Sequence, residues 1–167
     1  IKLIEKSEEV GKILMVAYPV RYLPIVRELK KILDSKKYGE PFQVSVWTEQ
    51  NTRPPENDPD NWMTKKDKLG GGQFFSHGCH YIDFLLWVLG KPKRGIHIGT
   101  TLGTEYMEGE GTSNAIIEFE SGALGYHFGT WGAKGTVHGY EFQIHCTKGF
   151  IEYDHDKGVI YARTNMD

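Results

Sequence analysis

Apolar residues recur every three or four positions in two stretches of the chain, which is the period of a helix with one buried face. The first stretch begins at Tyr22, carries Pro24 in its first turn, and is closed before Pro41. The second runs from Gln73 to Leu89 and follows three consecutive glycines. The pattern therefore predicts two helices, of which the second is apolar around much of its circumference.

Elsewhere apolar and polar residues alternate with the period of two that is typical of a strand. This alternation is clearest from Phe42 to Glu49, and Lys12 to Tyr18 forms a short apolar run that indicates a buried strand. Strands separated by short glycine-containing turns pair antiparallel. After the second helix we predict strands at Gly95–Thr101, Asn114–Glu120, Ala123–Trp131, His138–Thr147, Phe150–Tyr153 and Val159–Arg163.

Helices come first along the chain, and a series of consecutive strands follows. This order predicts an α+β fold in which helices cover one face of a large open, mainly antiparallel sheet. The other face of such a sheet is left to be covered. We therefore expect a homodimer or homotetramer formed through the sheet face, with Trp47 and Trp131 as candidate interface residues.

Composition narrows the class of protein. The 167 residues suit one domain, with 39% hydrophobic and 25% charged residues and a net charge of -2, so no nucleic-acid partner is expected. No apolar run approaches the roughly 20 residues that span a membrane. The two cysteines, Cys79 and Cys146, match no metal or disulfide pattern, which favours a reducing cytoplasm. The chain begins at Ile1 without a signal sequence, and we interpret its start as a cut inside a larger protein.

The stretch from Asn51 to Lys68 is predicted to be a loop because it holds three prolines and many charged residues. A loop of this length inside a compact domain is more often functional than an idle connection. Trp62 is therefore a candidate contact to a ligand. The alternative is that its side chain fastens the loop to the body of the domain.

The second helix carries a polar stripe on an otherwise apolar surface. Ser76, His80, Asp83 and Trp87 follow one another at helical spacing. A buried polar group without a partner costs about 1 to 3 kcal/mol, so this stripe must meet partners, water or a ligand, and we infer a cleft along it. Gly78 inside the helix predicts that a backbone or a ring approaches closely there.

Two alternatives compete with a catalytic stripe. In the first, His80 and Asp83 are core residues whose polar atoms bond to the backbone. In the second, His77, His80 and Asp83 bind a metal with Cys79 nearby. Steps of three residues drift around a helix, and zinc-binding helices commonly use histidines four apart, so no metal is expected.

Several segments together resemble the Gfo/Idh/MocA oxidoreductases. The most specific is GGGQFFSHGCHYIDFLLWVLG at 70–90, which is similar to a family pattern of three glycines, an acid, a glycine, a histidine and an aspartate. LMVAYPVRYLP at 14–24 resembles the end of the family's nucleotide-binding domain and the turn that follows it. The segments KILDSKKYGEP, IIEFESGALG and HCTKGFIEYD add further similarity.

The resemblance implies a two-domain enzyme whose nucleotide-binding half has a Rossmann fold and whose other half resembles the C-terminal domain of glyceraldehyde-3-phosphate dehydrogenase. Residues 1–18 would be the tail end of the Rossmann domain, and residues 19–167 the substrate-binding and oligomerisation domain. NAD or NADP would be bound mainly by the N-terminal domain, which is absent from this chain. The sequence agrees, since no G-x-G-x-x-G follows a predicted strand. The fragment alone is expected to be inactive.

Matched residue by residue, the family's catalytic histidine falls on His80, its helix aspartate on Asp83 and its turn arginine on Arg21. Two positions depart from the family. Ser76 stands where related dehydrogenases have the catalytic acid, and Pro19 stands where they have an asparagine.

The resemblance thus implies a dehydrogenase or reductase that acts on a CH-OH group of a sugar, polyol or related hydroxy compound. His80 is the expected proton acceptor, with Ser76 or His77 as its hydrogen-bond partner. The alternative is a non-catalytic ligand-sensing or regulatory member, which the loss of the acid at Ser76 supports. The remaining candidates are Arg21, Trp62, Lys68 and Asp83 for substrate binding, and Tyr18 and Pro19 for contact with the cofactor.

Overall fold

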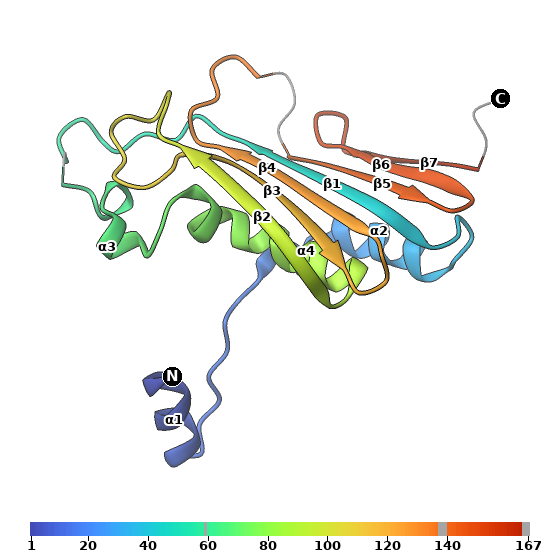
Figure 1. Cartoon of the computed structure of the whole chain (residues 1–167), viewed down its shortest axis with the longest axis horizontal. Helices are drawn as coiled ribbons and strands as arrows, with labels where there is room; N and C mark the ends of the chain where they lie inside the picture. Colours follow the sequence, from blue (N-terminus) through green and yellow to red (C-terminus); the bar gives the residue numbers. More distant parts are fainter. Residues whose placement is uncertain (59, 137–139, 165–167) are drawn as a thin grey trace.

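One sheet forms the body of the protein (Figure 1). In the computed structural model, which describes residues 1–58, 60–136 and 140–164, seven strands pair in the order β2-β3-β4-β1-β5-β6-β7. The pair β1 and β4 is parallel, and the other neighbouring pairs are antiparallel. The strands are β1 (Pro41–Glu49), β2 (Pro92–Thr100), β3 (Thr112–Phe119), β4 (Leu124–Thr130), β5 (Tyr140–Cys146), β6 (Gly149–Asp154) and β7 (Val159–Arg163).

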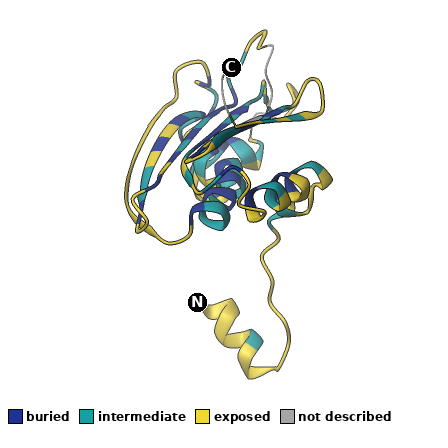
Figure 2. Ribbon diagram, turned by 90° about the vertical axis from the view of Figure 1, so that its right-hand side faces the viewer, coloured by how far each residue is buried: buried dark blue, intermediate teal, exposed yellow. Residues whose placement is uncertain are grey.

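Two helices, α2 (Pro24–Asp34) and α4 (Cys79–Leu89), lie on the same face of this sheet (Figure 2). The predicted α+β fold with helices on one face is therefore confirmed. In the described ranges, no helix is long and apolar enough to cross a membrane. The shorter helical segments are α1 (Lys2–Glu9), η1 (Pro19–Tyr22), η2 (Trp62–Thr64), α3 (Lys66–Leu69) and η3 (Phe74–Gly78).

The core lies between the sheet and these two helices. Every second residue of β1 from Val44 to Thr48 faces the helices and is fully buried, as the alternating pattern predicts. Phe84 and Leu85 of α4 are also fully buried against the strands. Burying such a side chain contributes about 1.5 to 3 kcal/mol relative to leaving it exposed, so α4 is anchored firmly.

The predicted elements differ from the observed ones mainly at their ends. The first helix begins at Pro24 and not at Tyr22, because Leu23 precedes a proline and is extended. The predicted loop 51–68 contains the short helices η2 and α3. Six predicted strands correspond to β2 through β7, although His138, where one of them was expected to begin, lies outside the described residues.

The strand predicted at Lys12 to Tyr18 is wrong for this structure. Residues 12–18 form no strand, and Ile13 and Met15 are 96% and 76% exposed. A strand needs a neighbour to satisfy its backbone groups, and none of the described strands pairs with this segment. Helix α1 precedes it and buries none of its residues, so the first 17 residues extend away from the sheet (Figure 2).

The expectation that Trp131 belongs to an exposed patch of the sheet is also wrong. Trp131 is 4% exposed and packs with Leu69 and Met107 in a second, smaller hydrophobic cluster beyond the end of β4. Leu69 comes from α3 and Met107 from the loop between β2 and β3, and the strand pattern around Trp131 does not reveal these partners. Trp47 does lie on the sheet face away from the helices, with its ring edge against Tyr126 at 6.1 Å between centroids.

Candidate functional site

The second helix begins with a turn of unusual geometry. Residues Phe74–Gly78 form a π-helical turn, and the regular α-helix starts only at Cys79. Such turns are rare and frequently mark functional sites. The turn carries Ser76 and His77, and the helix that follows carries His80 and Asp83. The polar stripe expected from the sequence is therefore divided between two kinds of helix.

Glu110, to which the sequence analysis attached no role, holds the start of this helix. Its carbonyl accepts a hydrogen bond from the backbone N–H of Gln73 at 2.7 Å, and its carboxylate accepts one from Phe74 at 3.3 Å. A side chain at Gly72 would collide with the Glu110 carboxyl group. The glycines before the helix thus make room for a negatively charged residue at the helix N-terminus, where it is stabilised.

The carboxylate of Asp83 is paired with the guanidinium of Arg21. Nε of Arg21 donates to Oδ2 at 2.5 Å and Nη2 donates to Oδ1 at 2.7 Å. The hydrogen bond to Asp83 raises the pKa of Arg21 above its usual value. The guanidinium also lies 5.2 Å from the ring centre of Trp87. This pair joins η1 to α4, so two residues predicted separately as substrate contacts bind each other in this structure.

Tyr18, next to η1, lies beside His80 of α4, close to where the ion pair connects these two segments. Their rings meet edge to face with centroids 6.0 Å apart, and the ring of His77 lies 6.3 Å from that of His80. Nδ1 of His80 is buried and has no hydrogen-bond partner among the described residues. The alternative in which His80 and Asp83 are core groups satisfied by the backbone therefore does not describe this site.

Ser76 makes no hydrogen bond to His80 within the described part of the chain, although both lie on the predicted stripe. The side chains of Trp62 in η2 and Lys68 in α3 are exposed, whereas the rings beside His80 are those of Tyr18 and His77. Pro19 is exposed at the start of η1.

A small cavity of about 190 Å³ adjoins the stripe and is lined by Tyr18, Phe74, Phe75, Cys79, Ile82, Asp83 and Leu86.

The ring expected near Gly78 is that of His127, on β4. A Cβ at position 78 would lie 3.0 Å from Cε1 of His127. Burial, together with the neighbouring His77 and His97, lowers the pKa of His127 to about 4. Burial and the proximity of His80 lower the pKa of His77 to about 4 as well. Both imidazoles are therefore neutral at pH 7.

The metal alternative finds no support in the geometry. Over residues 1–58, 60–136 and 140–164, no group of three His, Cys, Asp or Glu side chains is arranged to hold a metal ion. The carboxylate that the spacing offered as a ligand, Asp83, is held by Arg21 instead.

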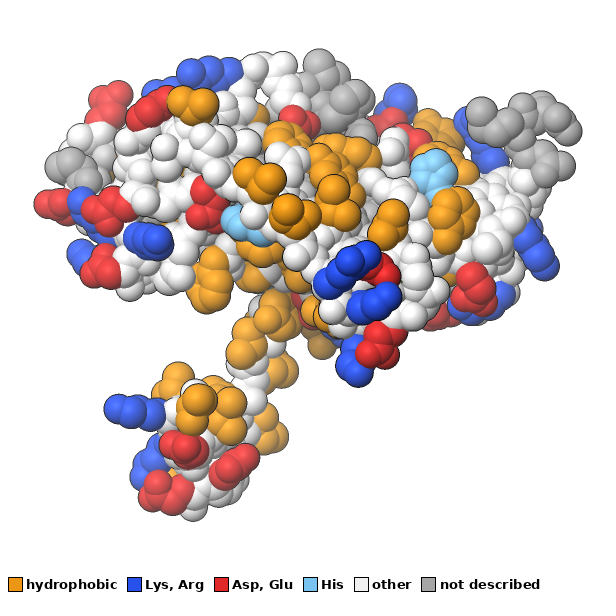
Figure 3. All heavy atoms as spheres, in the orientation of Figure 1, with side chains coloured by type: hydrophobic (Ala, Val, Ile, Leu, Met, Phe, Trp, Pro, Cys, Tyr) orange, Lys and Arg blue, Asp and Glu red, His pale blue; other side chains and the backbone are white. Residues whose placement is uncertain are grey.

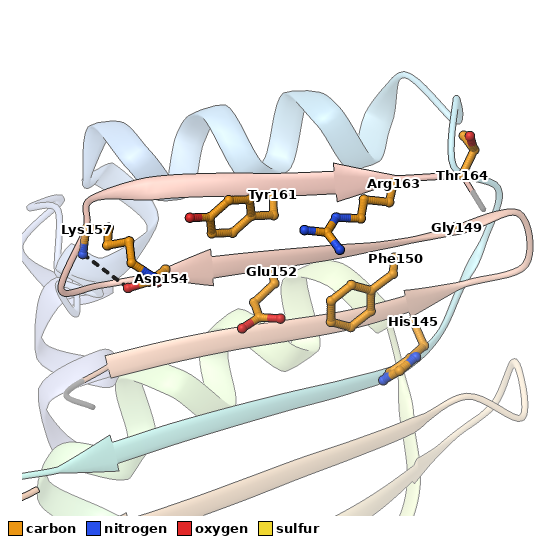
Figure 4. A pocket seen from close by; sticks show the side chains of 9 residues that line it. All are labelled: His145, Gly149, Phe150, Glu152, Asp154, Lys157, Tyr161, Arg163 and Thr164. Carbon is orange, nitrogen blue, oxygen red and sulfur yellow. Dashed lines mark hydrogen bonds and ion pairs between the residues drawn. The ribbon is translucent and has the colours of Figure 1, made fainter. Parts of the chain in front are cut away.

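A larger cavity than this one lies elsewhere, on the sheet face away from the helices (Figure 4). It is an open hollow of about 850 Å³ over β5, β6 and β7, and the side chains of Phe150, Glu152 and Tyr161 point into it. None of its lining residues belongs to the polar stripe, which lies on η3 and α4 at the opposite face of the sheet.

The sequence of this chain matches the family model of the GFO/IDH/MocA C-terminal domain over residues 26–152. The chain belongs to the Gfo/Idh/MocA family. The resemblance found in its sequence is confirmed, and so is the fold that this resemblance implied.

Two relatives of this Gfo/Idh/MocA chain are dehydrogenases of small hydroxy compounds. Levoglucosan dehydrogenase from Pseudarthrobacter phenanthrenivorans is 26% identical over 166 residues, which cover 86% of this chain and 42% of that protein. The NAD(+)-dependent scyllo-inositol 2-dehydrogenase from Bacillus subtilis is 28% identical over 125 residues, covering 72% of this chain and 34% of that protein. The chain thus spans less than half the length of these relatives.

Solved structures share the fold. WlbA dehydrogenase from Bordetella pertussis, in complex with NADH and UDP-GlcNAcA, is 24% identical and superposes with a TM-score of 0.83 over 99% of this chain and 51% of that one. Levoglucosan dehydrogenase in complex with NADH and levoglucosan is 22% identical, with a TM-score of 0.80 over 93% of this chain and 44% of that one.

A nicotinamide nucleotide of the kind these structures contain needs a phosphate-binding site and a reacting site. Glycines before a helix commonly bind phosphate. In this family member, however, the space beside the glycines at 70–72 is filled by Glu110 and by the side chain of Phe75. The reacting end fits better, because Nδ1 of His80 is a buried polar atom without a partner. The described residues therefore suit the chemistry at the reacting carbon and offer no phosphate cradle at this helix.

Proposed function

We propose that this chain is the substrate domain of an NAD-dependent dehydrogenase that oxidises a CH-OH group of a sugar, a polyol or a related compound. The observation that carries the proposal is the buried Nδ1 atom of His80, which has no partner among the described residues and lies beside Tyr18 on the family's most specific segment. The dehydrogenases of sugars and inositol among its relatives support this substrate class.

When bound, the cofactor supplies the hydride acceptor. The chain's own residues then handle the proton and the orientation of the substrate. The imidazole of His80 accepts the hydroxyl proton, for which an imidazole is suited at neutral pH. Ser76 can hydrogen-bond a substrate hydroxyl but cannot hold the negative charge of the acid found in related enzymes. The ion pair of Arg21 and Asp83 keeps Tyr18 against the His80 ring.

We further propose that residues 1–18 belong to the end of a Rossmann domain and that this domain binds most of the cofactor. The exposed apolar side chains of Ile13, Leu14 and Val16 would be buried against its strands. Trp62 and Lys68, both exposed, remain proposed substrate contacts, and Pro19 remains a proposed cofactor contact.

A second function is favoured by one observation, the serine at position 76. A member of the family without its catalytic acid would serve as a sensor that binds a sugar without oxidising it. Retention of His80, with a free ring nitrogen, favours the enzyme.

The test is an assay of the full-length polypeptide that contains this chain. We test it with a panel of sugars, inositols and anhydrosugars and expect reduction of NAD⁺, which is measured as the absorbance of NADH. The 167-residue chain alone serves as the control and is expected neither to reduce NAD⁺ nor to bind NADH at micromolar concentration. Saturable sugar binding by the full-length polypeptide without any turnover would favour the sensor instead.

We also propose that the exposed sheet face pairs with a second copy of the protein. Figure 3 shows hydrophobic side chains gathered over the middle of this face, where Ile96, Ile98, Ile116 and Leu124 are 46% to 67% exposed. An exposed apolar patch of this kind marks an association site.

Ile116→Asp is therefore expected to convert a dimer or tetramer of the full-length polypeptide into smaller species in sedimentation velocity. Leu102→Asp is the matched control, because Leu102 is 76% exposed but lies in the loop between β2 and β3. A wild type that stays monomeric at high concentration would contradict this assembly.

A further inference from the structure

Four polar side chains form a buried network beneath the π-helical turn. Thr48 is at its centre, where Oγ1 accepts a hydrogen bond from Nε2 of Gln73 at 3.2 Å and lies 3.3 Å from Nε2 of His127. The hydroxyl of Ser113 donates to Oε1 of Gln73 at 3.3 Å. All four side chains are at most 1% exposed. They come from β1, β3, β4 and the residue just before the turn, so the network spans three adjacent strands and reaches the helix.

Two glycines make the space for this network. Gly129 of β4 lies under the Gln73 amide, and any side chain at 129 would collide with it. Gly78, the last residue of the π turn, lies over the ring of His127, where an added Cβ would be 3.0 Å from Cε1. A glycine inside a helix is less stable there than an alanine, so the space that Gly78 leaves for the ring has a cost in helix stability.

Burying hydrogen-bonded polar groups gives little net stability. Replacing a buried polar cluster by well-packed apolar residues is often neutral or stabilising. Nδ1 of His127 is buried without a hydrogen-bond partner in the described structure, which further lowers the stability. Stability alone therefore does not explain these side chains, whereas a fully buried polar network does specify one arrangement of the groups it joins.

Both ends of the π turn depend on Thr48. Gln73 immediately precedes the turn and bonds to the Thr48 hydroxyl, while Gly78 ends the turn against His127, which lies beside the same hydroxyl. The turn is thus held just before its first residue and at its last residue by groups that meet at one atom of the sheet.

We propose that this network is a positioning device, in which Thr48 and His127 act as positioning residues that set the direction of His77 and His80 toward the substrate. The proposal rests on the dehydrogenase function proposed above. None of the four side chains touches the reacting atoms. Their effect is on geometry, because an error of about 1 Å in the placement of a catalytic group can lower the rate 100-fold.

A matched pair of variants at Thr48 tests the proposal in the full-length polypeptide. Thr48→Val keeps the shape of the side chain and removes the hydroxyl, whereas Thr48→Ser keeps the hydroxyl. We expect Thr48→Val to lower kcat by about 10-fold with the KM for substrate and NAD⁺ unchanged, and Thr48→Ser to retain kcat within about twofold. Equal kcat values for the two variants would overturn the proposal.

A second measurement does not depend on turnover. In the same polypeptide with isotope-labelled histidine rings, NMR signals assigned through His80→Asn and His77→Asn should move in Thr48→Val and not in Thr48→Ser. Unmoved signals in both variants would contradict the positioning role even if the protein proves to be no dehydrogenase. Absence of activity in the wild type would instead contradict the proposed function and leave the NMR result to decide this inference. Ser113→Ala, at the far end of the network, should produce smaller shifts in the same direction and replaces Thr48→Val if that variant does not fold.

Discussion

His80→Asn is expected to lower the kcat of the proposed dehydrogenase, measured in the full-length polypeptide, by about 10² to 10⁴-fold, the usual contribution of a correctly placed general base. Asparagine can still hydrogen-bond a substrate hydroxyl, but it cannot take up a proton near neutral pH. Because Nδ1 of His80 makes no hydrogen bond in the described structure, its removal leaves no buried partner unsatisfied. The melting temperature and the affinity for NAD⁺ should therefore change little.

The same replacement at His145 is the matched control for this experiment. His145 is exposed on β5, on the sheet face away from the helices, where its ring contacts Phe42 and Phe150. His145→Asn should leave kcat nearly unchanged. If His80→Asn kept near-normal turnover and only lowered the melting temperature, the catalytic assignment would be wrong, and His77 would become the next candidate.

Acid is expected to destabilise the fold between about pH 6.5 and pH 4. His77 and His127 each have a pKa lowered to about 4 by burial, whereas a histidine in the unfolded chain titrates near its usual value of about 6.5. The unfolded state therefore binds more protons in this interval, and the free energy of unfolding falls as the pH falls. The stability is fully present above about pH 6.5 and is lost as the pH approaches 4. For the fully buried His127 the loss is about 3 kcal/mol.

Urea unfolding of the wild type at a series of pH values measures this effect. His127→Gln removes the titrating ring and keeps a polar side chain, so its free energy of unfolding should depend less on pH over the same interval, although it should be lower at pH 7. His145→Gln, at an exposed position, should follow the wild-type curve. A wild-type stability that is constant from pH 6.5 to pH 4.5 would contradict the burial of these two histidines.

Much of the candidate site was visible in the spacing of residues along one helix. Ser76, His80 and Asp83 were identified there because polar residues interrupt an otherwise apolar surface, and Gly78 correctly predicted the close approach of a ring. The partners of these residues were not predictable in this way. Arg21 is 62 positions away from Asp83 along the chain, and no local pattern connects the two.

Local periodicity was sufficient for the α+β class, the two main helices and the strands β1 through β7, because burial of one face leaves a period of two or of 3.6 in the sequence. The insertion of β1 between β4 and β5 required the folded chain, since pairing between distant strands leaves no such period. The folded chain was needed in the same way for three other features: the burial of Trp131, the exposure of residues 12–18 and the network around Thr48. Each of these features is set by which distant segments lie beside a residue, and a side chain has the same local pattern whether or not such a neighbour is present.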